Sequence, residues 1–126
     1  MLRASLTGFG NRVNVRDWRI SWRTHAETLG ETPLEMRYAG LDPAARYKVR
    51  VVYGGDAQQI ELRLMANDQY EVHPWRKKDA TPAPVEFPVP REATAGGALS
   101  LKWTKQLGQG GAGRGVQICE VWLIRE

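Results

Sequence analysis

Apolar and polar residues alternate along most of this 126-residue chain with a period of two. Alternation of this kind predicts β-strands that bury one face and leave the other in water. About eight segments show it, and they are 13–24, 34–38, 46–53, 60–66, 70–72, 85–89, 99–103 and 116–124. No long segment has the period of a helix, so we predict an all-β protein.

The clearest strands lie on either side of a glycine-rich turn. Segment 46–53 has valine or tyrosine at alternate positions, and segment 60–66 has isoleucine and leucine in the same pattern. Gly54, Gly55 and Asp56 follow the first segment. Two such strands around a glycine-rich turn predict an antiparallel hairpin. Its apolar face needs a second sheet to cover it, so we predict a β-sandwich.

Polar and turn-forming residues predict the connections. Segment 25–32 is polar and is expected to be a loop, or at most a helical turn. Segment 73–84 is rich in proline, lysine and alanine, and is expected to be irregular. Segment 39–43 is predicted to turn because its proline fixes φ and its aspartate can bond the backbone ahead. Asn67 and Asp68 predict a second tight turn.

Two strands carry a signal about their place in a sheet. Prolines within and beside segment 85–89 remove ladder donors, which predicts an edge strand. Segment 116–124 is apolar on both faces, with Ile118 and Trp122 on one face and Val121 on the other. A strand of this kind is central, or it packs against a neighbouring domain.

Length and composition indicate one domain, residues 1–126, with a core of its own. The single cysteine, Cys119, excludes an internal disulfide, and its apolar neighbours favour a buried, unreactive thiol. No apolar run is long enough to span a membrane, and residues 1–12 lack the hydrophobic region of a signal peptide. We expect a domain of a longer secreted or periplasmic chain, with a cytoplasmic protein as the alternative.

The net charge of +4 comes mainly from arginines at alternate strand positions, which favours solvated strand faces. Basic residues interleaved with aromatic ones, as in Trp75-Arg76-Lys77-Lys78, also occur in proteins that bind single-stranded nucleic acids. One short cluster is not a continuous basic groove. We therefore expect neither a nucleic-acid partner nor a membrane partner.

The part of the chain from Tyr38 to Ile124 resembles galactose-binding-like β-sandwich modules. Residues 38–43 followed by 46–55 are similar to the central hairpin of their jelly roll, 90–103 to a later strand, and 113–123 to the closing strand. The resemblance implies a jelly-roll β-sandwich of about eight antiparallel strands. It also implies a non-catalytic carbohydrate-binding module that targets a carbohydrate-active enzyme to a polysaccharide. The implied partners are a polysaccharide or oligosaccharide and a parent catalytic domain.

The candidate binding residues follow from chemistry, because the family's ligand residues are not matched. Trp75 is the best stacking platform, since it stands beside Pro74 and Arg76 in a segment expected to be irregular. The other tryptophans occupy alternate strand positions and are expected in the core. Trp22 is the least certain of these because it adjoins the expected loop 25–32.

Two further segments carry groups that suit sugar hydroxyls. Arg23, His25 and Glu27 follow Trp22 and supply planar donors and acceptors. The alternative is a surface loop held by its own ion pairs. The glycine-rich segment 108–115, with Arg114 and the nearby Gln117, could bring backbone close to a ligand. The alternative there is a plain connection, and no P-loop pattern is present.

No catalytic triad is visible, and no metal or other cofactor is expected. His25, Glu27 and His73 could in principle form a site with two histidines and one carboxylate, but two distant histidines make this metalloenzyme hypothesis weak. The sequence leaves the binding of a structural calcium ion undecided, because backbone carbonyls and scattered carboxylates bind calcium without a sequence motif. A second alternative is a structural module that binds no ligand and packs on a catalytic domain. It requires an exposed apolar patch involving Trp122 or Ile124.

Overall fold

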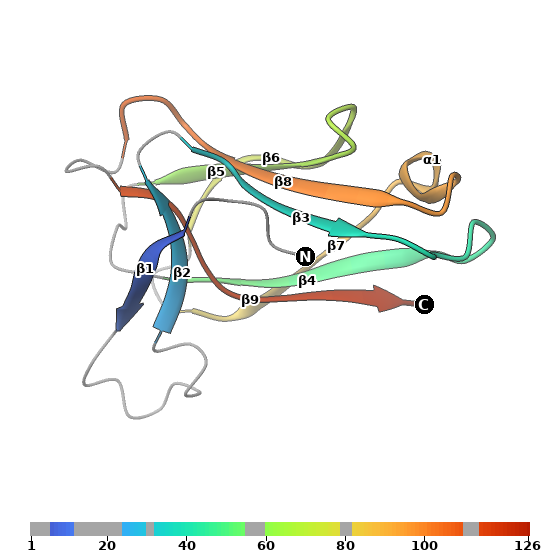
Figure 1. Cartoon of the computed structure of the whole chain (residues 1–126), viewed down its shortest axis with the longest axis horizontal. Coiled ribbons are helices and arrows are strands. Elements are labelled where there is room, and N and C mark those ends of the chain that lie inside the picture. The colour runs from blue at the N-terminus through green and yellow to red at the C-terminus, as the bar shows by residue number, and fades with distance from the viewer. Residues whose placement is uncertain (1–5, 12–23, 30–31, 55–59, 79–81, 110–113) are drawn as a thin grey trace.

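The computed structural model describes residues 6–11, 24–29, 32–54, 60–78, 82–109 and 114–126. Within these residues the chain is almost entirely β, as the alternation predicts (Figure 1). The elements are β1 (Leu6–Asn11), β2 (Thr24–Leu29), β3 (Leu34–Tyr38), β4 (Tyr47–Tyr53), β5 (Glu61–Ala66), β6 (Tyr70–Lys77), β7 (Pro84–Pro88), the short helix α1 (Arg91–Thr94), β8 (Leu99–Lys105) and β9 (Arg114–Arg125). No described helix is long and apolar enough to cross a membrane.

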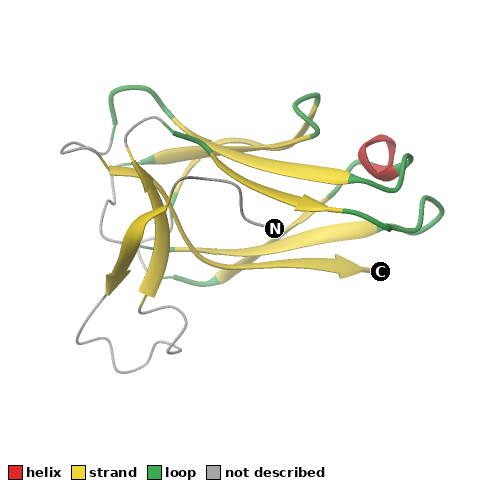
Figure 2. Ribbon diagram, viewed as in Figure 1, coloured by secondary structure: helices red, strands yellow, loops and turns green. Residues whose placement is uncertain are grey.

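The described strands form two layers. One sheet has the order β1-β2-β9-β4-β7 and the other has the order β3-β8-β5-β6. Every pair of neighbouring strands is antiparallel. The two sheets face each other, with α1 at one end (Figure 2). This arrangement confirms the predicted β-sandwich.

The core lies between the two sheets. Inward residues of β4, β5 and β8 are almost inaccessible to solvent, and the largest fully buried side chain is Trp103. The alternation predicted these residues correctly, because successive side chains of a strand point to opposite faces. The apolar area removed from water stabilises the fold by roughly 25 cal/mol for each Å².

The predicted hairpin is wrong, although both of its strands exist. β4 pairs with β9 and β7, whereas β5 pairs with β8 and β6 in the other sheet. Residues 54–60 therefore connect the two layers. Gly54 is buried, and a Cβ on it would collide with the sulfur of Cys119, so glycine permits close packing here. Alternation marks a strand but does not select its partner.

Two segments predicted as irregular are strands. Thr24–Leu29 forms β2, which pairs with β1 and β9. Tyr70–Lys77 forms β6, which extends well beyond the predicted end at residue 72 and carries Trp75. Both have polar or proline-containing sequences that local propensity does not favour in strands. Pairing with a neighbouring strand outweighs that propensity, and the edge position and irregular register of β6 accommodate Pro74.

Other local predictions are confirmed. β3 occupies its predicted residues, and β7 is an edge strand that pairs only with β4 in the described sheet. Asn67 and Asp68 both have positive φ, at 52° and 55°, in the tight turn between β5 and β6. Asp42 accepts a hydrogen bond from the backbone N–H of Ala44, as expected for the turn at 39–43. Of the predicted strand 13–24, all but Thr24 lies outside the described residues.

β9 lies between β2 and β4 in the sheet order, as its two apolar faces predicted. It pairs with β2 over residues 114–118 and with β4 over residues 118–125. The register of β9 against β4 shifts at Cys119, since Tyr53 is opposite Ile118 and Val52 is opposite Glu120. This irregularity reverses the alternation. Ile118 belongs to the core, and Val121 and Leu123 are partly buried and pack against it. Trp122, in contrast, is exposed. The predictions that Ile118 and Trp122 share a face and that Trp122 is buried are therefore wrong.

Candidate binding face on the five-stranded sheet

The outward side of β4, β7 and β9 is a regular array of side chains, which we call the Trp122 face. Arg50 lies opposite Trp122 on β9 and opposite Glu86 on β7. The next row consists of Lys48, Ile124 and Pro88. Because Val49 and Val51 belong to the core, Lys48 and Arg50 point away from it.

Charged groups on the Trp122 face hold one another in place. Glu86 accepts from both cations, at 2.7 Å from the Nη2 atom of Arg50 and 3.1 Å from the Nζ atom of Lys48. Hydrogen bonding to Arg50, and then to Lys48, lowers the pKa of Glu86 below its ordinary value of 4.5. The pair therefore presents a fixed planar guanidinium next to a carboxylate at neutral pH.

Trp122 is the aromatic group of this face. It is 55% exposed, although it lies within β9 opposite Arg50 of β4. Its indole Nε1–H points to the carboxylate of Glu120, with 3.4 Å between the nitrogen and Oε1. The flat ring, a planar donor and a carboxylate acceptor thus lie on one rigid surface. Sequence alternation missed Trp122 because the irregularity at Cys119 is not visible in the pattern.

Two of the predicted site residues, Trp22 and Arg23, lie outside the described residues. His25 lies on β2 opposite Gly10 of β1, and Arg114 begins β9 opposite Leu29. The structure describes the backbone of His25 and Arg114 but not their side chains.

Glu27 and Gln117 do come together, at a partly buried contact between β2 and β9. The Nε2 atom of Gln117 donates to Oε2 of Glu27 at 2.7 Å, and Gln117 is completely buried. Lys78, which is also buried, donates to Oε1 of Gln117 at 2.9 Å and to the carbonyl of Gly54 at 2.6 Å. Because these atoms satisfy one another away from solvent, we assign Glu27 and Gln117 a structural role.

Trp75 and Arg76 lie on β6, at the edge of the other sheet. Trp75 is 37% exposed, which is less than Trp122. The guanidinium of Arg76 stacks over Phe87 of β7, 5.3 Å from the ring centroid. Arg76 therefore helps to hold the edges of the two sheets together. Trp75 remains an accessible aromatic residue, but it lies on a different sheet from the Trp122 face.

His73 takes part in a buried hydrogen-bond chain between the sheets, together with Tyr53 and Trp103. Its Nδ1 atom is 2.8 Å from the carbonyl of Pro74, and its Nε2 atom is 2.6 Å from the hydroxyl of Tyr53. A carbonyl can only accept, so Nδ1 carries the proton and Nε2 accepts from Tyr53. The indole Nε1–H of Trp103 donates to the same hydroxyl at 2.8 Å.

Both ring nitrogens of His73 are thus engaged, which removes this residue from the metal-site hypothesis. Among the described residues, no group of three or more potential ligands could hold a metal ion.

Burial of His73 predicts a pH dependence of stability. Desolvation is the main cause that lowers the pKa of His73 below its ordinary value of 6.5, and Arg76 adds to the effect. The unfolded chain then binds the proton more readily than the folded one, so stability is lost as the pH falls below 6.5. We expect a lower melting temperature at a pH of about 5.5 than at about 7.5, a range in which carboxylates change little.

The control for this prediction is His73→Gln, which keeps a hydrogen-bond acceptor but does not titrate. Its melting temperature should vary less between the two pH values than that of the wild type. His25→Gln removes the other histidine of the chain and should leave the wild-type dependence intact. If the pH dependence of the melting temperature disappeared only in His25→Gln, its assignment to His73 would be contradicted.

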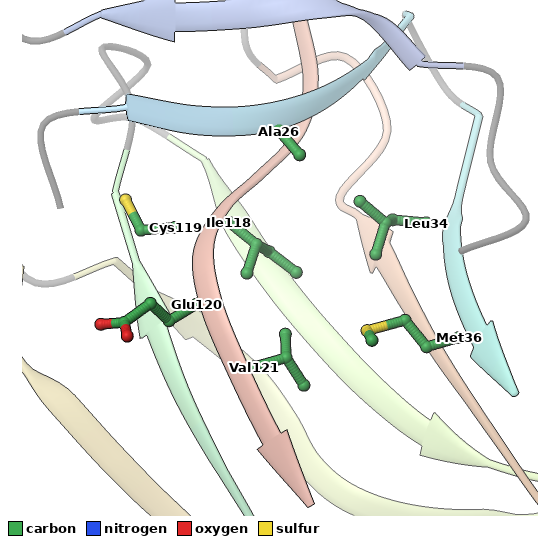
Figure 3. A pocket seen from close by; sticks show the side chains of 7 residues that line it. All are labelled: Ala26, Leu34, Met36, Ile118, Cys119, Glu120 and Val121. Carbon is green, nitrogen blue, oxygen red and sulfur yellow. The ribbon is translucent and has the colours of Figure 1, made fainter. Parts of the chain in front are cut away.

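An apolar pocket of about 150 Å³ opens between β2, β3 and β9. Leu34, Met36, Ile118 and Val121 point toward one another across it, while the side chains of Cys119 and Glu120 point away (Figure 3). Cys119 is partly exposed rather than fully buried. Since no charged side chain is directed into the pocket, it offers little to orient a polar ligand.

Comparison with protein-family models, with curated proteins and with solved structures finds no match to this chain.

Proposed function

We propose that this protein is a non-catalytic carbohydrate-binding module and that the Trp122 face is its binding surface. The exposed ring of Trp122 on a rigid sheet carries the proposal. The aliphatic C–H face of a sugar ring packs on such an aromatic surface, and its hydroxyls require planar donors and acceptors beside the ring. Arg50 and Glu86 supply both, and they are already held in place by their mutual ion pair.

The arrangement also supports binding with little loss of conformational freedom. Trp122, Arg50 and Glu86 stand on three paired strands, so the ligand does not need to order a loop. We further propose that the sandwich is a galactose-binding-like jelly roll and that the module belongs to a larger secreted or periplasmic carbohydrate-active enzyme. The sequence resemblance of residues 38–124 supports this part of the proposal.

The test is affinity electrophoresis of the folded protein against a panel of neutral and acidic polysaccharides. We expect specific retardation by at least one of them, and we expect Trp122→Ala to weaken that binding at least tenfold, or about 1.4 kcal/mol. The melting temperature should change little, because Trp122 is largely exposed.

Trp75→Ala is the matched control, since it removes an exposed tryptophan from the opposite sheet. It should retain binding. If Trp75→Ala abolished binding while Trp122→Ala retained it, the binding surface would lie on β6 instead. Absence of binding by the folded wild type to a broad panel would overturn the proposal.

A second candidate function follows from the same surface. Trp122 is exposed and Ile124 is partly exposed beside it, so an apolar contact is available to a neighbouring domain. In this case the module packs on a catalytic domain without a ligand of its own. It predicts that the longer parent chain shields Trp122 from a fluorescence quencher such as acrylamide. A carbohydrate-binding face would stay accessible in the parent chain.

A further inference from the structure

A second pocket is lined by residues near the start of α1 and the end of β9. These two elements reach the same end of the molecule (Figure 1). The volume of the pocket is about 230 Å³. The lining consists of Arg46, Tyr47, Pro88, Val89, Arg91 and Glu126. These residues come from the start of β4, the segment from the end of β7 to the first residue of α1, and the residue after β9. We call it the Arg46–Arg91 pocket.

The Arg46–Arg91 pocket continues the Trp122 face. Arg46 is two residues before Lys48 and Glu126 is two residues after Ile124, so both continue the outward alternation of their strands. Trp122 and Glu126 are four positions apart in the sequence, which corresponds to about 13 Å of extended chain. A linear oligosaccharide stacked on Trp122 and lying along the strands would therefore reach the pocket.

Backbone hydrogen bonds fix the walls of the pocket. The N–H of Glu126 donates to the carbonyl of Arg46 at 2.9 Å, and the N–H of Val89 donates to the carbonyl of Tyr47 at 3.0 Å. Tyr47 and Val89 are buried and form an apolar floor. These hydrogen bonds fix the backbone of Arg46 and of the segment that precedes Arg91.

The cations of this pocket differ from those of the rest of the Trp122 face in their ion pairing. Lys48 and Arg50 both pair with the carboxylate of Glu86, and Arg125 pairs with Asp42 at 2.8 Å. The side chains of Arg46 and Arg91 have no ion pair or hydrogen bond with any described residue. Glu126 lines the pocket, but its carboxylate is not within 4 Å of either guanidinium.

We propose that the Arg46–Arg91 pocket is a subsite for an anionic substituent, so that the carbohydrate ligand is an acidic polysaccharide. Guanidinium groups bind carboxylates and sulfates through paired N–H donors, and two of them converge on one pocket here. The anion is a uronate carboxylate or a sulfate ester. This inference rests on the proposed carbohydrate-binding function and specifies the class of its ligand.

The test compares a galacturonic acid trisaccharide with its methyl ester, which has the same rings without the charge. By calorimetry at low salt, the wild type should bind the acid about tenfold more tightly than the ester, a preference that salt should weaken. Dextran sulfate against dextran provides the equivalent comparison for a sulfate ester. A preference in the first pair identifies a carboxylate subsite, and a preference in the second identifies a sulfate subsite.

Three variants locate the effect. Arg46→Ala with Arg91→Ala should remove the preference for the acid and leave binding of the ester unchanged. Glu126→Gln should strengthen binding of the acid, because it removes a negative charge from the lining. Arg63→Ala with Lys77→Ala takes two positive charges from the other sheet and should preserve the preference.

The outcomes separate this inference from the proposed function. If neutral and acidic ligands bind equally and Trp122→Ala weakens both, the function stands and the subsite is overturned. An NMR titration of isotopically labelled protein with free galacturonate, and separately with inorganic sulfate, tests anion binding at the pocket independently of binding at Trp122. One of the two anions should shift the amide resonances of Val89 and of residue 91 in Trp122→Ala, whereas neither resonance should shift in Arg46→Ala with Arg91→Ala. Absence of these shifts in the wild type with both anions would also overturn the subsite.

Discussion

Replacing Lys78 with methionine is expected to lower the free energy of unfolding by about 3 kcal/mol, because a buried hydrogen-bond network would lose its cation. The ammonium group of Lys78 donates to the carbonyl of Gly54 and to the side chain of Gln117, which in turn donates to Glu27. Methionine fills a similar volume, so the change isolates the lost donors from the loss of packing. The carbonyl and the amide oxygen would lose a donor while they remain buried.

Denaturant unfolding measures this effect, with an unchanged slope as the sign that the native state is otherwise intact. Lys77→Met is the matched control, since Lys77 is the exposed neighbour in sequence, and a surface change of this kind costs less than about 0.5 kcal/mol. In the double variant Lys78→Met with Gln117→Met, we expect a loss smaller than the sum of the single losses, because the two residues share a contact. Equal effects of Lys77→Met and Lys78→Met would contradict the role of the network.

Replacing Tyr53 with phenylalanine is the second change for which we expect a large loss, of about 2 to 3 kcal/mol, because it removes a hydroxyl with two buried partners. The indole N–H of Trp103 would lose its acceptor, and the Nε2 atom of His73 would lose its donor. Trp103 and His73 are almost completely buried, so water cannot replace the hydroxyl without rearrangement. Burial also raises the pKa of Tyr53 far above its ordinary value, so the phenol stays protonated and can donate.

Tyr38→Phe provides the control for this prediction. Tyr38 is partly exposed, and its hydroxyl has no hydrogen bond with any described residue, so its loss should change the free energy of unfolding by less than about 0.5 kcal/mol. Similar losses for Tyr38→Phe and Tyr53→Phe would show that the buried chain does not contribute as inferred. Both variants can be compared by denaturant unfolding near neutral pH, where His73 is neutral.

Several functional groups were recognisable in the sequence only as residue types. Glu27, Gln117 and Trp75 were selected as ligand contacts because their chemistry suits sugars. The fold places Glu27 and Gln117 in a buried network with Lys78, which no sequence pattern associates with them. Arg46 and Arg91 lie 45 positions apart in sequence, and they meet at one pocket only because β4 and β7 are paired.

The alternation of apolar and polar residues was enough to predict the all-β fold class, the position of most strands and the identity of most core residues. The reason is that strand alternation is local: each residue points to the face opposite its neighbour's, whatever the strand later pairs with. The tight turn at Asn67 and the edge position of β7 were also predictable, because positive φ and missing N–H donors belong to single residues.

The pairing of the strands and the outward position of Trp122 follow from contacts between distant segments, which the alternation does not encode. β4 and β5 lie in different sheets because their partners come from distant parts of the chain, and period-two alternation is identical for every choice of partner. A register shift between β4 and β9 at Cys119 reverses the alternation of β9 and turns Trp122 to the surface. The proposed binding face therefore depends on a register shift between two strands that are far apart in sequence.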